Sequence, residues 1–160
     1  MTNQMKKDTV IFDLDGTLAD ITARRAYSTK PNGKIDWAKF FDPANISMDL
    51  PNPAVISMAK ILADAGYKIW IFSGRSAATI DATKEWLFDN GVTYDRLIMR
   101  PTSKDMAHMP DDQLKWLWLD EHFPGDQKSR ILCTYDDRDK VVAMWRANGL
   151  TCMQVNYGNF

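Results

Sequence analysis

Short apolar runs alternate with stretches of helical periodicity along most of this 160-residue chain. The runs typical of buried strands lie at 9–12, 67–72, 96–99, 130–135 and 150–155. The stretches typical of helices lie at 52–66, 76–91, 111–123 and 138–149. Strands and helices that alternate in this way predict a mostly parallel five-stranded sheet with helices on both faces, a Rossmann-like α/β sandwich.

One segment breaks the alternation. Residues 20–51 are rich in polar residues, Pro and Asn, and hold an aromatic cluster, DWAKFF, at 36–41. The segment is too long for an ordinary βα loop. We therefore expect a small cap insertion between the first and second core strands, within one domain that spans residues 1–160.

The composition excludes a protein whose overall charge drives binding. The net charge is −1, so no global basic field favours nucleic acid or membranes. Residues 21–40, however, hold five basic side chains against Asp36 alone, which indicates either a solvated surface or a positive rim for an anionic substrate. The polar N-terminus and the short apolar run after it predict neither a signal peptide nor a membrane span, so we expect a cytoplasmic protein. Cys133 and Cys152 are expected to be buried thiols on neighbouring strands.

Side chains that can do chemistry follow three of the predicted strands. In open α/β sheets ligands bind at the carboxyl ends of the strands, so we expect these groups to meet at one edge. The residues at the strand ends, together with a lysine from the helix before the fourth strand, are Asp13, Asp15, Ser73, Gly74, Arg75, Lys115, Asp136 and Asp137.

Each residue type has a role if the substrate is a phosphate ester. Asp13 can attack phosphorus and form an aspartyl-phosphate. Asp15 can protonate the leaving oxygen and then deprotonate the hydrolytic water. Ser73 can donate a hydrogen bond to a phosphoryl oxygen, and Lys115 can neutralise the phosphoryl group and restrain Asp13.

Four carboxylates, those of Asp13, Asp15, Asp136 and Asp137, are candidate ligands for Mg²⁺, whose charge would offset their repulsion. Each motif alone has a plainer interpretation: an Asx turn for DLDGT, an acidic helix start for DDR, and a solvated helix residue for Lys115. Their order and placement together favour one active site.

These motifs resemble those of the haloacid dehalogenase (HAD) superfamily of phosphohydrolases. They are DLDGT at 13–17, FSGR with Ser73, Lys115, and YDDR with Asp136 and Asp137. The resemblance implies a HAD sandwich and a Mg²⁺-dependent phosphatase, in which Asp136 touches the metal and Asp137 supports the site. It also makes Thr17 and Gly74 candidate substrate-binding residues.

A closer resemblance is to the 3′-phosphatase domain of phage-type polynucleotide kinase-phosphatases. It rests on Arg24, nine residues after Asp15, on Arg75, on Asp111 before Lys115, and on DDRDKVVAMWRANGLTCMQVNYGNF at 136–160. The resemblance implies that Arg24 and Arg75 hold the substrate phosphate or line its entry, with Asp111 as a further binding residue. No P-loop occurs in the chain, so kinase activity is not expected.

The function expected from these features is removal of a terminal phosphate, 3′ in preference, from polynucleotide ends or nucleotides. The alternatives are a 5′(3′)-nucleotidase or other small-molecule phosphatase, and a non-catalytic binding module on the same fold. Trp37, Phe40 and Phe41 either pack the insertion onto the sheet or form a stacking surface for a nucleobase.

Overall fold

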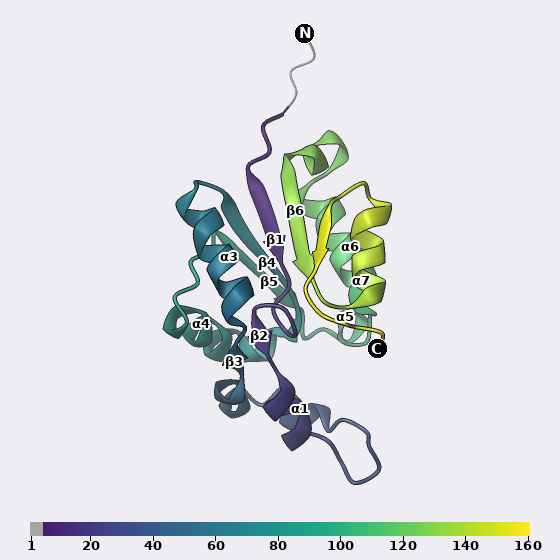
Figure 1. The fold of residues 1–160 in the computed structure, drawn as a ribbon. Helices are drawn as coiled ribbons and strands as arrows, with labels where there is room; N and C mark the ends of the chain where they lie inside the picture. Colours follow the sequence, from purple (N-terminus) through teal and green to yellow (C-terminus); the bar gives the residue numbers. More distant parts are fainter. Residues whose placement is uncertain (1–4) are drawn as a thin grey trace.

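The computed structural model describes residues 5–160, and its centre is a parallel sheet of five strands in the order β5-β4-β1-β6-β7 (Figure 1). The strands are β1 (Thr9–Phe12), β4 (Lys68–Ser76), β5 (Arg96–Arg100), β6 (Ile131–Asp136) and β7 (Cys152–Gln154). The predicted α/β sheet is confirmed. Strand β4, predicted at 67–72, continues as far as Ser76. The reason is that β5 pairs with it again beyond an irregularity between Ser73 and Ser76.

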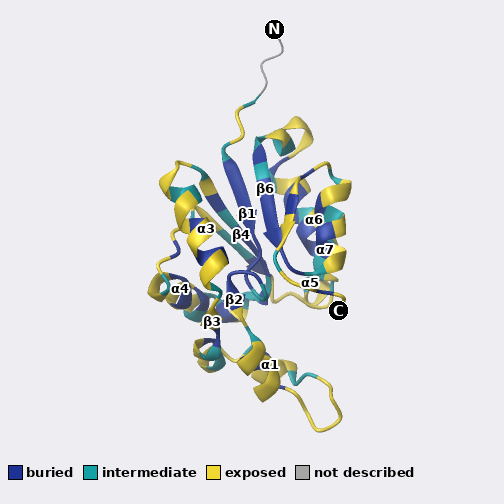
Figure 2. Cartoon of the chain, viewed as in Figure 1, coloured by how far each residue is buried: buried dark blue, intermediate teal, exposed yellow. Residues whose placement is uncertain are grey.

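Helices cover both faces of the sheet, because successive side chains of a strand point to opposite sides. Val10 and Phe12 of β1 join the core beneath α3 (Pro53–Asp64) and α4 (Ile80–Asp89). Ile11 joins the core beneath α6 (Asp111–His122) and α7 (Asp139–Ala147). Figure 2 shows the buried residues running along β1, β4 and β6 between these two helical layers.

The order of the strands sets where a ligand would bind. From β1 the chain builds outward to β4 and β5, and then returns to place β6 against the other side of β1. The carboxyl ends of β1 and β6 therefore flank the point where the winding direction reverses, which is the usual ligand site in open α/β sheets.

The segment between β1 and β4 forms several short elements at the carboxyl end of the sheet (Figure 1). Strands β2 (Ala19–Asp20) and β3 (Leu50–Pro51) pair antiparallel and close its base. Between them lie α1 (Thr22–Tyr27), α2 (Trp37–Phe40) and the 3₁₀ helix η1 (Pro43–Met48). The remaining short elements are η2 (Ala77–Thr79), α5 (Lys104–Ala107) and η3 (Gly125–Arg130).

The two cysteines follow the prediction. Cys133 on β6 and Cys152 on β7 are buried, free thiols on neighbouring strands. Among the described residues no helix has the length and apolar character needed to cross a membrane.

Candidate active site

Three carboxylates meet where β1 and β6 end. Oxygens of Asp13, Asp136 and Asp137 all lie within 4.8 Å of one another. The strands hold this spacing, because the backbone N–H of Asp13 donates to the carbonyl of Tyr135 at 2.9 Å. Residues from the two ends of the chain are thus brought together, as the sequence predicted.

Lys115 lies in the middle of this acidic cluster rather than in solvent. Its Nζ donates to Asp13 Oδ1 at 2.7 Å and to Asp136 Oδ2 at 2.9 Å, and the residue is only 1% exposed. Burial alone would lower the pKa of Lys115, but the charges of Asp13 and Asp136 outweigh burial and raise it. Lys115 therefore stays a cation throughout the physiological range of pH.

Neutral donors also bind the carboxylates of Asp13 and Asp136. Thr17 Oγ1 donates to Asp13 Oδ2 at 2.9 Å, and Trp145 Nε1 donates to Asp136 Oδ2 at 3.2 Å. The backbone N–H of Asp137 donates to Asp136 Oδ1 at 3.0 Å. Thr17, a candidate substrate-binding residue, thus directs its hydroxyl to the predicted nucleophile.

The charges of the cluster suit a divalent cation. Three carboxylates and one ammonium leave two negative charges, and Asp137 forms no ion pair within residues 5–160. Burial, aided by the charge of Asp136, raises the pKa of Asp137 to about 6, and burial likewise raises the pKa of Asp13. Mg²⁺ prefers oxygen ligands, and its charge would offset the repulsion among these three buried carboxylates. Asp13, Asp136 and Asp137 therefore fit the ion.

Asp15 lies apart from that cluster, which differs from the prediction of four metal ligands. Its Oδ1 accepts from Arg24 Nη2 at 3.0 Å, from Arg75 Nε at 3.1 Å and from Arg75 Nη2. Burial alone would raise the pKa of Asp15, but the charges of Arg75 and Arg24 outweigh it and hold this pKa below its ordinary value.

Asp49 completes a buried network of two arginines and two aspartates. Its oxygens accept from Arg24 Nε at 2.8 Å, Arg24 Nη2 at 3.1 Å and Arg75 Nη2 at 2.8 Å. Burial raises the pKa of Asp49 despite these partners. Asp49 was not among the predicted site residues, because it lies in the insertion outside every motif. No local pattern in the sequence marks Asp49, because its pairing with Arg24 and Arg75 exists only in the folded chain.

Arg24 does not line the entry to the site. The side chain is fully buried, and its Nη1 donates to the carbonyl of Phe40 at 2.9 Å. Its guanidinium also lies 4.3 Å from the centre of the Phe40 ring. Arg24 therefore connects Asp15 to the insertion instead of facing a ligand, whereas Arg75 does border the cavity described below.

Asp111 is bound to two arginines on the other side of the site. It accepts from Arg100 Nη2 and, at 3.1 Å, from Arg138 Nη1. Arg100 also donates to the carbonyl of Gly74 at 2.9 Å and so joins the β4 irregularity to the start of α6. A Cβ on Gly74 would lie 2.5 Å from the Asp111 carboxylate, so only glycine allows this approach.

Ser73 ends the regular part of β4 and is fully buried. Its Oγ accepts from the backbone N–H of Arg75 at 3.2 Å. No protein acceptor takes the Ser73 hydroxyl hydrogen in the described part of the chain. The hydroxyl therefore keeps a hydrogen to donate.

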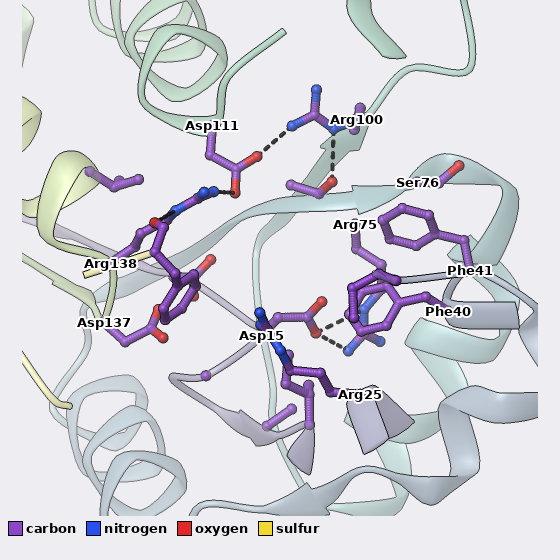
Figure 3. Close-up of a pocket in the computed structure, with 18 of the residues that line it drawn as sticks. Asp15, Arg25, Phe40, Phe41, Arg75, Ser76, Arg100, Asp111, Asp137 and Arg138 are labelled. Carbon is purple, nitrogen blue, oxygen red and sulfur yellow. Dashed lines mark hydrogen bonds and ion pairs between the residues drawn. The ribbon is translucent and has the colours of Figure 1, made fainter. Parts of the chain in front are cut away.

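A cavity of about 1410 Å³ opens over these groups. Its walls include Asp13, Asp15, Lys115, Asp136 and Asp137 from the centre of the site, and residues of the insertion also line it. Figure 3 draws Phe40, Phe41 and Arg75 on one side of the pocket and Asp111 and Arg138 on the other. A phosphoryl group would fill only a small part of this space.

Comparison with known proteins agrees with this geometry. Residues 7–160 match the family model of the polynucleotide kinase PNKP phosphatase domain. The chain belongs to this family. It is accordingly a HAD-type phosphatase domain, and the resemblance noted in the sequence is confirmed.

Solved structures resemble the chain over nearly its full length. A chain of the Pnkp1/Rnl/Hen1 RNA repair complex is 30% identical with a TM-score of 0.78, and the alignment covers 100% of this protein and 48% of that chain. This protein thus spans about half the length of that relative. A predicted phosphatase from Clostridium acetobutylicum is 14% identical with a TM-score of 0.71, over 96% of this protein and 87% of that chain, and shares the fold.

Proposed function

We propose that this protein is a Mg²⁺-dependent phosphatase that removes 3′-phosphates from nucleic acid ends through an aspartyl-phosphate intermediate. The observation that carries the proposal is the Asp13–Asp136–Asp137 cluster, with Lys115 in its centre and Asp15 nearby on the same cavity. The family of PNKP phosphatase domains supports a nucleic acid substrate.

In the first step, a carboxylate oxygen of Asp13 attacks phosphorus, and the bond from phosphorus to the ester oxygen breaks. Lys115 stabilises the negative charge of the phosphoryl oxygens and orients Asp13 through its 2.7 Å hydrogen bond. Ser73, whose hydroxyl keeps a hydrogen to donate, is the proposed donor to a phosphoryl oxygen. Arg75 of β4 borders the cavity and holds Asp15 through its ion pair.

Asp15 is the proposed general acid and general base. It gives a proton to the leaving ester oxygen, and in the second step it takes one from the water that attacks the aspartyl-phosphate, so phosphate leaves and Asp13 is regenerated. The two arginines make protonated Asp15 a stronger acid than an ordinary carboxyl group. A bound phosphate dianion brings negative charge close to Asp15, which favours its protonated form before the first step.

Mg²⁺, held by Asp13, Asp136 and Asp137, would supply positive charge to neutralise these carboxylates and the phosphoryl group. The three carboxylates fit the ion, because they offer clustered oxygen ligands with two uncompensated negative charges. A D,D-heptose bisphosphate phosphatase from B. bronchiseptica, 13% identical over 92% of this protein and 79% of that chain, with a TM-score of 0.56, shares the fold and is complexed with magnesium and phosphate.

The test is a comparison of kcat/KM among 3′-phosphorylated oligonucleotides, 5′-phosphorylated oligonucleotides, 3′- and 5′-mononucleotides, and sugar phosphates. We expect the 3′-phosphorylated oligonucleotides to have the highest kcat/KM. Higher values for 5′-mononucleotides would favour a nucleotidase, and higher values for sugar phosphates would contradict a nucleic acid substrate.

A further inference from the structure

The cavity is far larger than the phosphoryl site, and its outer part is lined by aromatic side chains. Trp37 and Phe41 of the insertion border it together with Ile35, and Trp37 is 60% exposed. Large aromatic rings left in contact with water at the mouth of a charged cavity typically serve in ligand binding.

The rings of Trp37 and Phe41 stack against each other and form an aromatic surface whose exposed ring is that of Trp37. Their centroids are 5.7 Å apart with an interplanar angle of 18°, so the two rings lie nearly parallel. Phe40 packs edge-on against both rings, at 5.5 Å from Trp37 and 5.1 Å from Phe41. Phe40 is itself buried and held by Arg24, so the surface rests on a fixed support.

A positive charge without a carboxylate partner lies on the same cavity. Arg25 is exposed, borders the cavity, and forms no ion pair within residues 5–160. Its guanidinium lies 5.2 Å from the centre of the Phe160 ring. The neighbouring Arg24, by contrast, is fully neutralised by Asp15 and Asp49.

We propose that this outer part of the cavity binds the last nucleoside of a single-stranded nucleic acid, with its base stacked on the exposed ring of Trp37, which Phe41 supports from behind, and the preceding phosphodiester at Arg25. The proposal rests on the proposed function, which places the terminal phosphate at Asp13. The stacked base must be unpaired, because a base-paired end would keep its faces in the duplex. Sugar phosphates and abasic ends would leave the aromatic surface empty.

The first experiment compares two oligonucleotides that carry the same 3′-phosphate and differ only in whether the last residue has a base. Base stacking on an aromatic ring contributes about 1–3 kcal/mol, so we expect the wild-type kcat/KM to be about 5- to 150-fold higher with the base. Trp37→Ala should bring that ratio close to one, and Trp37→Phe should restore most of it.

Phe88→Ala is the matched control, because Phe88 is an exposed aromatic residue, at 82%, that does not line the cavity. It should keep the wild-type ratio. A wild-type ratio of one, or a Trp37→Ala ratio equal to that of wild type, would overturn the proposal.

A binding measurement separates failure of this proposal from failure of the proposed function. If the wild type released no phosphate from any oligonucleotide, the proposed function would fail, and the dissociation constants of the same two oligonucleotides would still test the aromatic surface. Weaker binding of the base-bearing strand to Trp37→Ala supports the surface, whereas equal binding contradicts it.

Arg25 has its own test. Arg25→Gln should reduce the salt dependence of binding of a 3′-phosphorylated oligonucleotide, lowering the slope of log K against log salt by about one. A 3′-mononucleotide has no preceding phosphodiester, so its kcat/KM should change much less. An equal loss for both substrates would contradict the assigned contact.

Discussion

Single side chains carry the chemistry of this site, and Asp13 is the first to test. Asp13→Asn keeps an oxygen that can accept from Lys115 but removes the charged nucleophile. We expect phosphate release to fall by a factor on the order of 10³ or more, with the melting temperature close to that of wild type. Steady-state phosphate release measures the first quantity, and thermal unfolding measures the second.

Asp89→Asn is a control for this prediction, because it makes the same chemical change at an exposed carboxylate at the end of α4. It should behave as wild type. Turnover by Asp13→Asn within about tenfold of wild type would exclude Asp13 as the nucleophile.

Asp49 is a positioning residue, because it acts through Arg24 and Arg75 rather than by touching the substrate. Asp49→Asn leaves both arginines to be balanced by Asp15 alone, which lowers the pKa of Asp15 further. The limb of the pH–rate profile governed by Asp15 should therefore move to lower pH. Misplacement of these groups should also reduce kcat/KM by about 10- to 100-fold.

The pH profile distinguishes this role from simple loss of stability. A variant that is merely less stable would lose activity without moving the limb. Asp64→Asn, at an exposed position of α3, is the matched control and should keep both the profile and the rate.

Among the secondary structure elements, the turn that follows β1 constrains the site most. Gly16 has φ +84°, and a Cβ there would lie 2.1 Å from Asp137 Oδ2. Gly16→Ala should lose about 1–2 kcal/mol of stability from backbone strain alone. It should also displace Asp137, so we expect lower activity and a higher Mg²⁺ concentration at half-maximal rate.

Gly33→Ala is the control for the backbone strain that Gly16→Ala introduces. The φ of Gly33 is +79°, yet a Cβ there would meet no atom within 4 Å. Gly33→Ala should lose a similar amount of stability in thermal unfolding and keep the Mg²⁺ dependence of wild type. If both variants changed the Mg²⁺ dependence equally, contact between Gly16 and Asp137 would not be the cause.

For the protein as a whole, the acidic cluster links metal binding to stability. The two uncompensated negative charges favour unfolding, and an ion that binds only the folded state raises the free energy of unfolding by about 2.7 kcal/mol at 100 times its dissociation constant. We expect EDTA to abolish phosphate release and lower the melting temperature, and added Mg²⁺ to restore both. Activity and melting that are unaffected by EDTA would contradict the metal site.

Much of the architecture followed from local patterns. Short β-rich runs and amphipathic helices have different periods, so the strand and helix order and the parallel sheet were predicted correctly. The limits of β4 were not, because pairing beyond Ser73 depends on β5 and on a register shift that periodicity does not encode. Lys115 alone resembled a solvated helix residue, and only its place opposite Asp13 and Asp136 makes a buried lysine favourable.

The sequence by itself determined the family, the order of the elements and the residues at the strand ends, because motif spacing and side-chain periodicity are local properties of the chain. The tertiary structure alone decided how the charges pair. It moved Arg24 from a predicted phosphate contact into a buried network with Asp15 and Asp49, and it set Trp37 and Phe41 at the edge of the cavity. Such pairings join residues far apart in the chain, and ion pairs and ring stacking depend on distances that only the folded chain defines.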